Sequence, residues 1–383
     1  MRSGRLVTLL AFLLVTAALV IMPAERSGWD AAGVISFLTT FATTVAIYGL
    51  FVLGLNVQWG YAGVFNFGVA AFFLVGAYTA AIFTKGPAES EFVRYVGGFG
   101  ERLDLLPFLS SGEWLPFLVG ALAAALMCGV LAFLMSIPTL RLREDYLAIA
   151  TIGIAELMRN VVIAEEGLVN SQRGLTGIPR PFGSFFDPGD YKFVYFGIAV
   201  VLLALVFYAV EKSIRSPWGR VLRALREDET VTAASGKNVF AFKTQGFVFG
   251  AVVMGVGGAV YAYEQGGLSP DTFSHFSGTF IFWVMLVLGG SGNNRGALLG
   301  AYVVWGLWIV SLQLLSYPMP EVLSVRIFYL RDLLLGLLLI AVLLLRPQGL
   351  LPEERRVSIW VERLIRRHPL PRREEAPAAS RGE

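Results

Sequence analysis

The stretch FVYFGIAVVLLALVFYAV at residues 193–210 contains no charged residue. About 20 mostly apolar residues in an α-helix are enough to cross the hydrocarbon core of a bilayer. Further stretches of the same kind occur along the chain, so the sequence predicts an all-α, polytopic membrane protein with about ten spans. The predicted spans are residues 6–22, 33–55, 64–84, 114–137, 146–164, 193–210, 240–263, 273–290, 297–316 and 326–345.

The composition of the whole chain agrees with this prediction. Apolar residues make up 56% of the 383 residues and charged residues 15%, whereas soluble domains average about 45–50% apolar and about 25% charged residues. A soluble protein of this composition would expose large apolar patches, which soluble proteins avoid. The composition therefore excludes a soluble enzyme, a nucleic-acid-binding protein and a disordered scaffold.

Reactive side chains are scarce in this sequence. The single cysteine is Cys128, and the two histidines, His275 and His368, are far apart and make no ligand pair. The only Gly-Lys pair, Gly236-Lys237, lacks the upstream glycine of a P-loop. We therefore expect no enzymatic activity, no metal site and no cofactor, and ATP would have to be bound by partner subunits.

The distribution of basic residues predicts the orientation of the spans, because cytoplasmic loops are enriched in Lys and Arg. With the N-terminus inside, most of the 31 Lys and Arg residues fall in cytoplasmic segments, and the external loops are richer in acid. An even number of spans also places the C-terminus inside. We expect residues 1–350 to form one transmembrane domain. Residues 351–383 would form a cytoplasmic basic tail, either an amphipathic helix on the lipid surface or a partly ordered segment.

The largest predicted cytoplasmic loop contains an amphipathic helical pattern at residues 216–236. Ser216 is a good N-cap residue, Pro217 suits the first helical position, and Gly236 offers a C-terminal stop. The helix would carry an apolar stripe next to a basic face. The apolar stripe consists of Val221, Leu222 and Leu225, and the basic face consists of Arg220, Arg223 and Arg226. Such a helix either docks a soluble partner or anchors the loop at the lipid surface.

Two glycine-rich segments fall at membrane depth, at residues 60–68 and 289–296. Glycine there permits either broken helices, which commonly build transport paths, or close helix packing. Polar groups in or beside the spans are candidates for a translocation path, because they are costly in a bilayer. The candidates are Asn56, Tyr61, Asn66, Glu156 and Arg159. Glu156 and Arg159 share one helix face and either line a polar path or neutralise each other.

Four stretches together resemble one known family. They are residues 55–78 (LNVQWGYAGVFNFGVAAFFLVGAY), 142–159 (LREDYLAIATIGIAELMR), 174–179 (GLTGIP), and the region from 216 through 289–300 with the later RPQGL at 346–350. Over residues 45–352 the chain resembles the permease subunits of branched-chain amino acid ABC importers, of the LivM type.

The resemblance implies that residues 216–236 form a coupling helix, which sits in a cleft of an ATP-binding subunit and transmits its closure. The candidate coupling residues are Gly219, Arg220, Arg223, Arg226, Glu227 and Gly236. The resemblance also implies an assembly in the inner membrane. Its other members would be a second, LivH-like permease subunit, two ATP-binding subunits and an extracytoplasmic substrate-binding protein.

The expected function is import of branched-chain amino acids or related small polar solutes, driven by ATP hydrolysis in partner subunits. The chain departs from the usual pattern of the family at Val69, Lys237 and Ala297, and these departures leave the substrate open. Import of urea or a short-chain amide is the alternative. A stand-alone secondary transporter is the rival class, against which stand the scarcity of charge within the spans and the partner-like helix.

Overall fold

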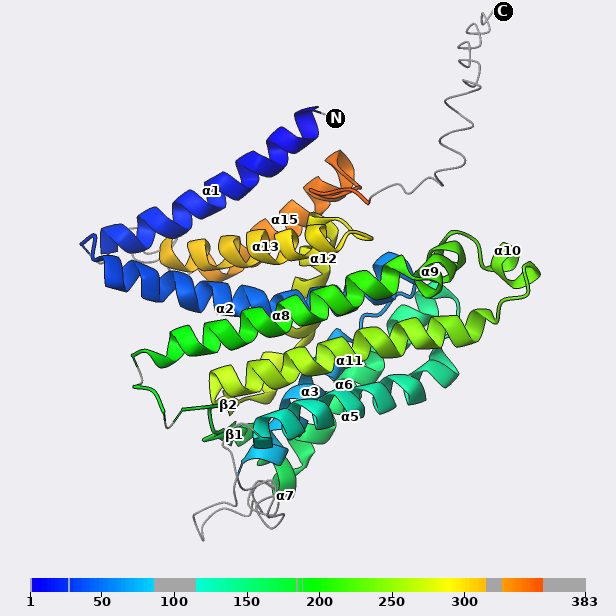
Figure 1. The fold of residues 1–383 in the computed structure, drawn as a ribbon, viewed down its shortest axis with the longest axis horizontal. Helices are drawn as coiled ribbons and strands as arrows, with labels where there is room; N and C mark the ends of the chain where they lie inside the picture. Colours follow the sequence, from blue (N-terminus) through cyan, green and yellow to red (C-terminus); the bar gives the residue numbers. More distant parts are fainter. Residues whose placement is uncertain are drawn as a thin grey trace, which may run out of the picture.

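The computed structural model describes residues 2–26, 28–85, 115–183, 185–187, 189–314 and 326–353. Its long helices run side by side in a bundle, and two short strands lie at one end (Figure 1). In chain order the elements are α1 (Arg2–Arg26), α2 (Ala31–Leu55), η1 (Asn56–Tyr61), α3 (Val69–Thr84), α5 (Leu115–Thr139), α6 (Glu144–Ala164), α7 (Glu166–Val169), η2 (Ser171–Arg173), β1 (Leu175–Thr176), α8 (Tyr191–Arg215), α9 (Pro217–Glu227), α10 (Glu229–Ala234), α11 (Val239–Gln265), β2 (Gly267–Leu268), η3 (Pro270–Phe273), η4 (Phe276–Phe280), α12 (Ile281–Gly289), α13 (Asn294–Leu314) and α15 (Ile327–Leu345). The predicted all-α membrane fold is confirmed.

Every predicted span contains a helix in the described part of the chain. Among the described residues, 6 helices are long and apolar enough to cross a membrane on their own. These are Ala31–Tyr61, Pro116–Thr139, Glu144–Ala164, Tyr191–Arg215, Val239–Gln265 and Asn294–Leu314. Shorter apolar helices occupy Phe12–Glu25, Val69–Thr84 and Phe276–Gly289. The total number of spans and their orientation stay predictions.

Two of the predicted spans contain less regular α-helix than expected. The span predicted at residues 64–84 becomes α3 only from Val69, because the chain leaves the helical conformation at Gly63, whose φ is +69°. The span predicted at residues 273–290 divides into the π-helix η4 and the short α12. Gly290 follows α12 with a φ of +113°, which residues with a side chain rarely adopt. Both irregularities fall beside the glycine-rich segments.

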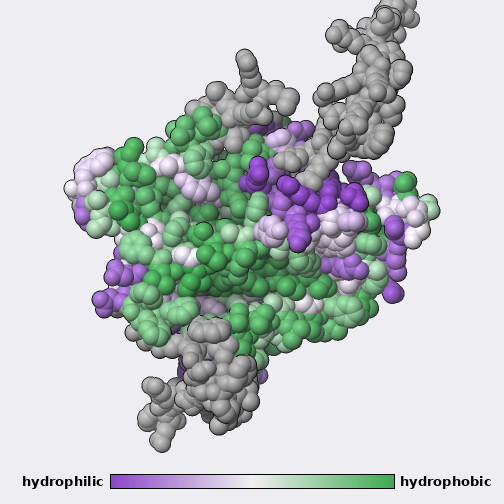
Figure 2. Space-filling view, in the orientation of Figure 1, coloured by the Kyte–Doolittle hydropathy of each residue, from purple (hydrophilic) through white to green (hydrophobic). Residues whose placement is uncertain are grey.

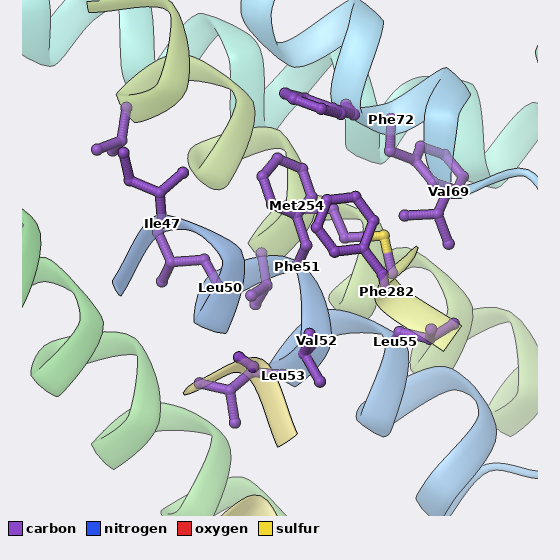
Figure 3. Close-up of a cluster of buried hydrophobic side chains, with 14 of the residues drawn as sticks. Ile47, Leu50, Phe51, Val52, Leu53, Leu55, Val69, Phe72, Met254 and Phe282 are labelled. Atoms are coloured by element: carbon purple, nitrogen blue, oxygen red, sulfur yellow. The ribbon is translucent and has the colours of Figure 1, made fainter. Parts of the chain in front are cut away.

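The centre of the bundle is packed with apolar side chains from α2, α11 and α12. Phe51 of α2 stacks on Phe282 of α12 with ring centroids 4.8 Å apart, beside Met254 of α11 (Figure 3). Close backbone contact joins α3 to α11, since a Cβ atom on Gly76 would lie 2.6 Å from the carbonyl oxygen of Gly255. Small residues of this kind let helices associate in lipid, where hydrophobic burial supplies little drive.

The bundle has two ends, which we name after their elements. At the α9 end, Arg226 of α9 contacts Gly60 after α2 and Glu353 after α15. At the β end, β1 pairs antiparallel with β2 through Leu175 and Leu268. The two ends lie at opposite sides of the bundle in Figure 1. The described loops that are predicted to be cytoplasmic, such as those between α5 and α6 and between α12 and α13, lie at the α9 end.

The lateral surface between these ends is apolar where α5 and α8 face outward. Figure 2 shows this apolar surface, with hydrophilic residues gathered near the α9 end. Large apolar side chains on it are more than half exposed, as expected for residues that face lipid tails. They include Leu122, Leu126, Val201 and Leu205.

Candidate functional site

The predicted coupling segment, residues 216–236, folds as two helices, which corrects the expectation of a single helix. α9 has Pro217 in its first turn and ends at Asp228, whose backbone is extended at φ −157° and ψ 112°. The Asp228 carboxylate accepts hydrogen bonds from the backbone N–H groups of Thr230 at 2.8 Å and Val231 at 3.0 Å. Aspartate favours such a cap over a place inside a helix, so it ends α9 and starts α10.

The cap is strengthened by a side chain. The Thr230 hydroxyl donates to the Asp228 carboxylate at 2.6 Å, and this bond lowers the pKa of Asp228 below its ordinary value. The predicted stop is confirmed, because Gly236 follows α10 with a φ of +78°.

α9 packs its apolar side against the bundle. Gly219, Leu222 and Leu225 are buried there. A Cβ atom at Gly219 would lie 2.2 Å from the carbonyl oxygen of Ile214, so only glycine fits where α9 turns back on α8. The apolar stripe predicted from the sequence thus fastens α9 to the protein.

The three arginines of α9 point in different directions. One guanidinium N–H group of Arg226 donates a hydrogen bond to the carbonyl oxygen of Gly60, and another donates to the Glu353 carboxylate at 2.7 Å. Arg223 donates to the last-turn carbonyl oxygen of α8 at 2.8 Å. Arg220 is exposed to solvent. Two of the three charges therefore bind the chain itself rather than face outward.

The six predicted coupling residues separate into a group that holds α9 on the bundle and a group that is exposed. The holding group is Gly219, Arg223 and Arg226. The exposed group is Arg220, Glu227 and Gly236. Any partner that approaches this end meets the exposed group first, together with Val231 of α10, which is 65% exposed.

A strap of residues 346–353, which follows α15, closes over the α9 end. Its backbone N–H groups at Leu350 and Leu351 donate to the carbonyl oxygens of Leu288 at 2.8 Å and Gly289 at 2.9 Å. The strap thus satisfies carbonyl groups left open where α12 ends. It ends at Glu353, the partner of Arg226. The sequence signalled this segment only through its RPQGL motif, and no spacing pattern pairs Glu353 with α9.

A buried polar chain lies beneath α9. Asn56 Nδ2 donates to Asn294 Oδ1 at 2.9 Å, and Asn294 Nδ2 donates to the Glu211 carboxylate at 2.7 Å. The backbone N–H of Gly292 donates to Asn56 Oδ1 at 2.8 Å. Tyr61 lines a small polar cavity of about 30 Å³ next to this chain, which is room for about one water molecule. These bonds satisfy polar groups that an interrupted helix leaves buried.

Asn66 has a similar place in the non-helical stretch before α3. Its Nδ2 donates to Gln58 Oε1 at 2.7 Å, its Oδ1 accepts from the Gly68 N–H at 2.8 Å, and its carbonyl oxygen accepts from Trp283 Nε1 at 2.9 Å. Asn56, Tyr61 and Asn66 are all buried, and the two asparagines hold irregular backbone in place through the Gly292 and Gly68 N–H groups. Their assignment to a translocation path stays a prediction.

Glu156 and Arg159 lie in a separate cluster toward the β end. Arg159 forms ion pairs with Glu156 at 3.3 Å and with Asp271 at 3.1 Å. His275 Nε2 lies 3.0 Å from the Glu156 carboxylate. The structure brings the predicted pair together and adds two residues that the sequence did not indicate. No hydrogen bond within the described ranges joins this cluster to Asn56, Tyr61 or Asn66.

Among the residues that the structure describes, no three or more His, Cys, Asp or Glu side chains come together in an arrangement that could hold a metal ion. Cys128 is buried and donates its thiol to the carbonyl oxygen of Phe72 at 3.3 Å.

Comparison with known proteins places the fold in a family. The family described as "Branched-chain amino acid transport system / permease component" matches residues 37–343. The chain belongs to this permease family. The high-affinity branched-chain amino acid permease protein LivM of Escherichia coli is 30% identical over 341 residues, covering 82% of this chain and 70% of the relative.

Other relatives of this permease carry different names. The nucleoside ABC transporter permease NupC of Lactococcus lactis is 26% identical over 68% of this chain and 76% of its own length. The permease LivH of Salmonella typhimurium is 24% identical over 82% of this chain and 95% of its own length. No solved structure matches the chain significantly. The resemblance to LivM-type permeases is confirmed, and the chain is a multi-pass permease component of the inner membrane.

Proposed function

We propose that this permease imports branched-chain amino acids as one of two permease subunits in an ABC importer. Two ATP-binding subunits and an extracytoplasmic substrate-binding protein complete the assembly, together with a LivH-like permease. The permease has no chemistry or cofactor of its own. ATP bound by the partner subunits alternates the access of its passage between the two sides of the membrane.

The observation that carries this proposal is the position of α9. Its inner side is buried, and Arg226 ties it to η1 and to the strap. When a partner pushes on the exposed residues Arg220 and Glu227, α9 therefore transmits the displacement to the helix bundle. This is the mechanical property that a subunit driven by ATPase closure requires.

The substrate is supported by the names of the relatives. The LivM of Escherichia coli is named for branched-chain amino acids, and it covers most of this chain. NupC is named for nucleosides and is less similar over a shorter region, so family membership alone leaves room for other solutes. Urea and short-chain amides stay the alternative substrates.

Reconstitution with purified partners tests this function. The chain, a LivH-like permease, two ATP-binding subunits and the binding protein are placed in liposomes, and uptake of leucine, urea and a nucleoside is measured with and without ATP. We expect ATP-dependent uptake of leucine. ATP-dependent uptake of urea alone would assign the alternative substrate. Gradient-driven uptake by this chain without partners would replace the proposal with a secondary transporter.

A charge reversal tests the role assigned to α9. Arg220→Glu should weaken co-purification of the ATP-binding subunits and reduce uptake at least about tenfold, since the coupling energy of a close charge pair at a protein interface starts at about 1.5 kcal/mol. Arg143→Glu is the matched control, because Arg143 is also an exposed arginine at the α9 end but lies outside α9. Equal uptake by both variants and the unaltered protein would remove Arg220 from the docking edge.

A further inference from the structure

One lateral face of the bundle carries charged side chains that are only partly covered. We name it the α6–η4 face and define it by Glu156, Arg159, Asp271, His275, Phe276 and Phe280. The side chains of Glu156 and His275 are 37% and 34% exposed, and that of Asp271 is 87% exposed. Phe276 and Phe280 beside them are 40% and 44% exposed.

Part of this face lies within the depth of the membrane. α6 has 21 residues, which gives a length of about 31 Å, close to the thickness of the hydrocarbon core. Glu156 is eight residues from the end of α6 at Ala164, so it lies about 12 Å inside that end. Its helix neighbours Leu157 and Val161 are 55% and 53% exposed, as residues that face lipid at this depth would be.

Lipid cannot be what covers the α6–η4 face. A carboxylate in contact with hydrocarbon costs several kcal/mol, and intramembrane charges almost always face protein or a water-filled cavity. Backbone outside regular helices follows the same rule. Pro270 in the 3₁₀ turn η3 offers its carbonyl oxygen to Arg159 at 3.2 Å on this face. By contrast, the outward sides of α5 and α8 expose apolar residues, so the protein does possess surfaces suited to lipid.

The same kind of surface continues from η4 to α13 and α15. The ring of Phe276 lies 6.1 Å from that of Trp308, and the guanidinium group of Arg331 stacks 3.5 Å above the Trp308 ring. Asp332 pairs with Arg331 at 3.0 Å. Aromatic residues and arginine are enriched in protein–protein interfaces. The Arg331 side chain is itself only 13% exposed, and that of Asp332 is 40% exposed. The α6–η4 face and its continuation thus have the composition of an interface.

From these observations we propose that the α6–η4 face is the surface on which the second, non-identical permease subunit packs. The inference rests on the proposed function, which requires such a subunit. Charge selects this occupant over a second copy of the same chain. The face and its continuation hold three carboxylates and two guanidinium groups, those of Glu156, Asp271, Asp332, Arg159 and Arg331. The excess is one carboxylate, with the His275 ring beside Glu156. A second copy would bring the same excess and no added base to offset it, whereas a different subunit can present polar or basic side chains.

Site-specific photo-crosslinking in the whole importer tests this surface. The photoreactive amino acid benzoylphenylalanine replaces Phe276 in one variant and Phe280 in another, since both changes keep a large aromatic side chain. Leu205, which lies on α8 and is 61% exposed, is replaced in the matched control. Adducts are identified by mass spectrometry, and ATP-dependent uptake is measured on the same samples.

We expect at least ten times more adduct with the second permease from positions 276 and 280 than from position 205. Adducts of both face positions with lipid only, with the binding protein, or with another copy of this chain would overturn the proposed surface. Because uptake is measured in parallel, such a result with normal uptake would leave the proposed function standing. Absence of uptake by the unaltered complex would instead count against the proposed function itself.

Discussion

The α9 end and the α6–η4 face both concentrate charged residues, but they use them differently. At the α9 end, Arg226 is engaged on two sides, by Gly60 and by Glu353, which come from distant parts of the chain. On the α6–η4 face, Glu156, Arg159 and their partners contact one another and stay partly exposed. Charges of the first kind fix the conformation of this chain, whereas charges of the second kind, at membrane depth, indicate a surface that another molecule completes.

The largest effect is expected at the close contact between α12 and α13. A Cβ atom on Gly300 would lie 1.8 Å from the carbonyl oxygen of Met285 and 2.9 Å from the backbone of Gly289. Gly300→Ala should therefore force α12 and α13 apart and destabilise the protein by about 3 kcal/mol. Thermal unfolding of the detergent-solubilised chain measures this loss.

The matched control is Gly153→Ala on α6, where an added Cβ atom meets nothing within 4 Å. It should leave the unfolding temperature unchanged or raise it slightly, because alanine favours helix over glycine by up to about 1 kcal/mol. Similar losses in the two alanine variants would show that the contact between α12 and α13 is no more tightly packed than the surroundings of Gly153 on α6.

The next largest effect concerns the ion pair between Arg226 and Glu353 at the α9 end. Arg226→Gln removes the charge that binds Glu353 and should lower the free energy of unfolding by about 1–2 kcal/mol, since both side chains are only partly shielded from solvent. Arg220→Gln should change it by less than about 0.5 kcal/mol, as expected for an exposed site. A double-mutant cycle with Glu353→Gln isolates the pair. A coupling energy near zero would show that the ion pair between Arg226 and Glu353 does not stabilise the protein.

On the α6–η4 face we expect a substitution to change uptake more than it changes the stability of the isolated chain. Glu156→Gln keeps the size of the side chain and removes its charge, so it should change the stability of the isolated chain by less than about 1 kcal/mol. If the face meets the second permease, ATP-dependent uptake should nevertheless fall at least fivefold. Glu165→Gln, an exposed carboxylate just beyond the end of α6, is the control. Unchanged uptake in both variants would argue against a functional role for Glu156.

The smallest effect is expected at the cap between α9 and α10. Asp228→Ala should raise hydrogen–deuterium exchange of the amides in residues 229–234 without altering global unfolding, whereas Asp228→Asn keeps an accepting oxygen and should change little. The lowered pKa of Asp228 means that the cap bonds are present above the unfolded-state pKa of about 3.9. They are lost only as the pH falls through the still lower folded-state pKa. Faster exchange that begins already near pH 6 would contradict this assignment.

Much of the fold was predictable because a bilayer restricts backbone choice so strongly. An apolar stretch in lipid must satisfy its own N–H and C=O groups, so it forms a helix whatever its neighbours do. This is why residues 193–210 could be assigned to a span from composition alone. The apolar stripe and the glycine stop of the 216–236 segment were equally local. The break at Asp228 was not predicted, although the capping preference of aspartate was a signal for it.

The candidate site was predictable only in part. The sequence selected Arg220, Arg223 and Arg226 as one basic face, and the structure turns Arg223 and Arg226 inward. The glycines at residues 60–68 and 289–296 correctly predicted irregular backbone. The sequence offered broken helices and close helix packing as alternatives, and the structure shows both. Close packing at Gly289 and Gly300 occurs beside the break at Gly290.

The sequence by itself determined that the chain is an all-α membrane protein, where its helices fall, and that it resembles the LivM-type permeases, because these properties depend on local composition and short motifs. Only the tertiary structure decided that Asn56 binds Asn294 across 238 positions, that Glu353 returns to hold Arg226, and that His275 joins Glu156. Such pairs depend on which helices lie side by side and at what height. That arrangement is set by the packing of many side chains at once, and no periodicity within one helix contains it.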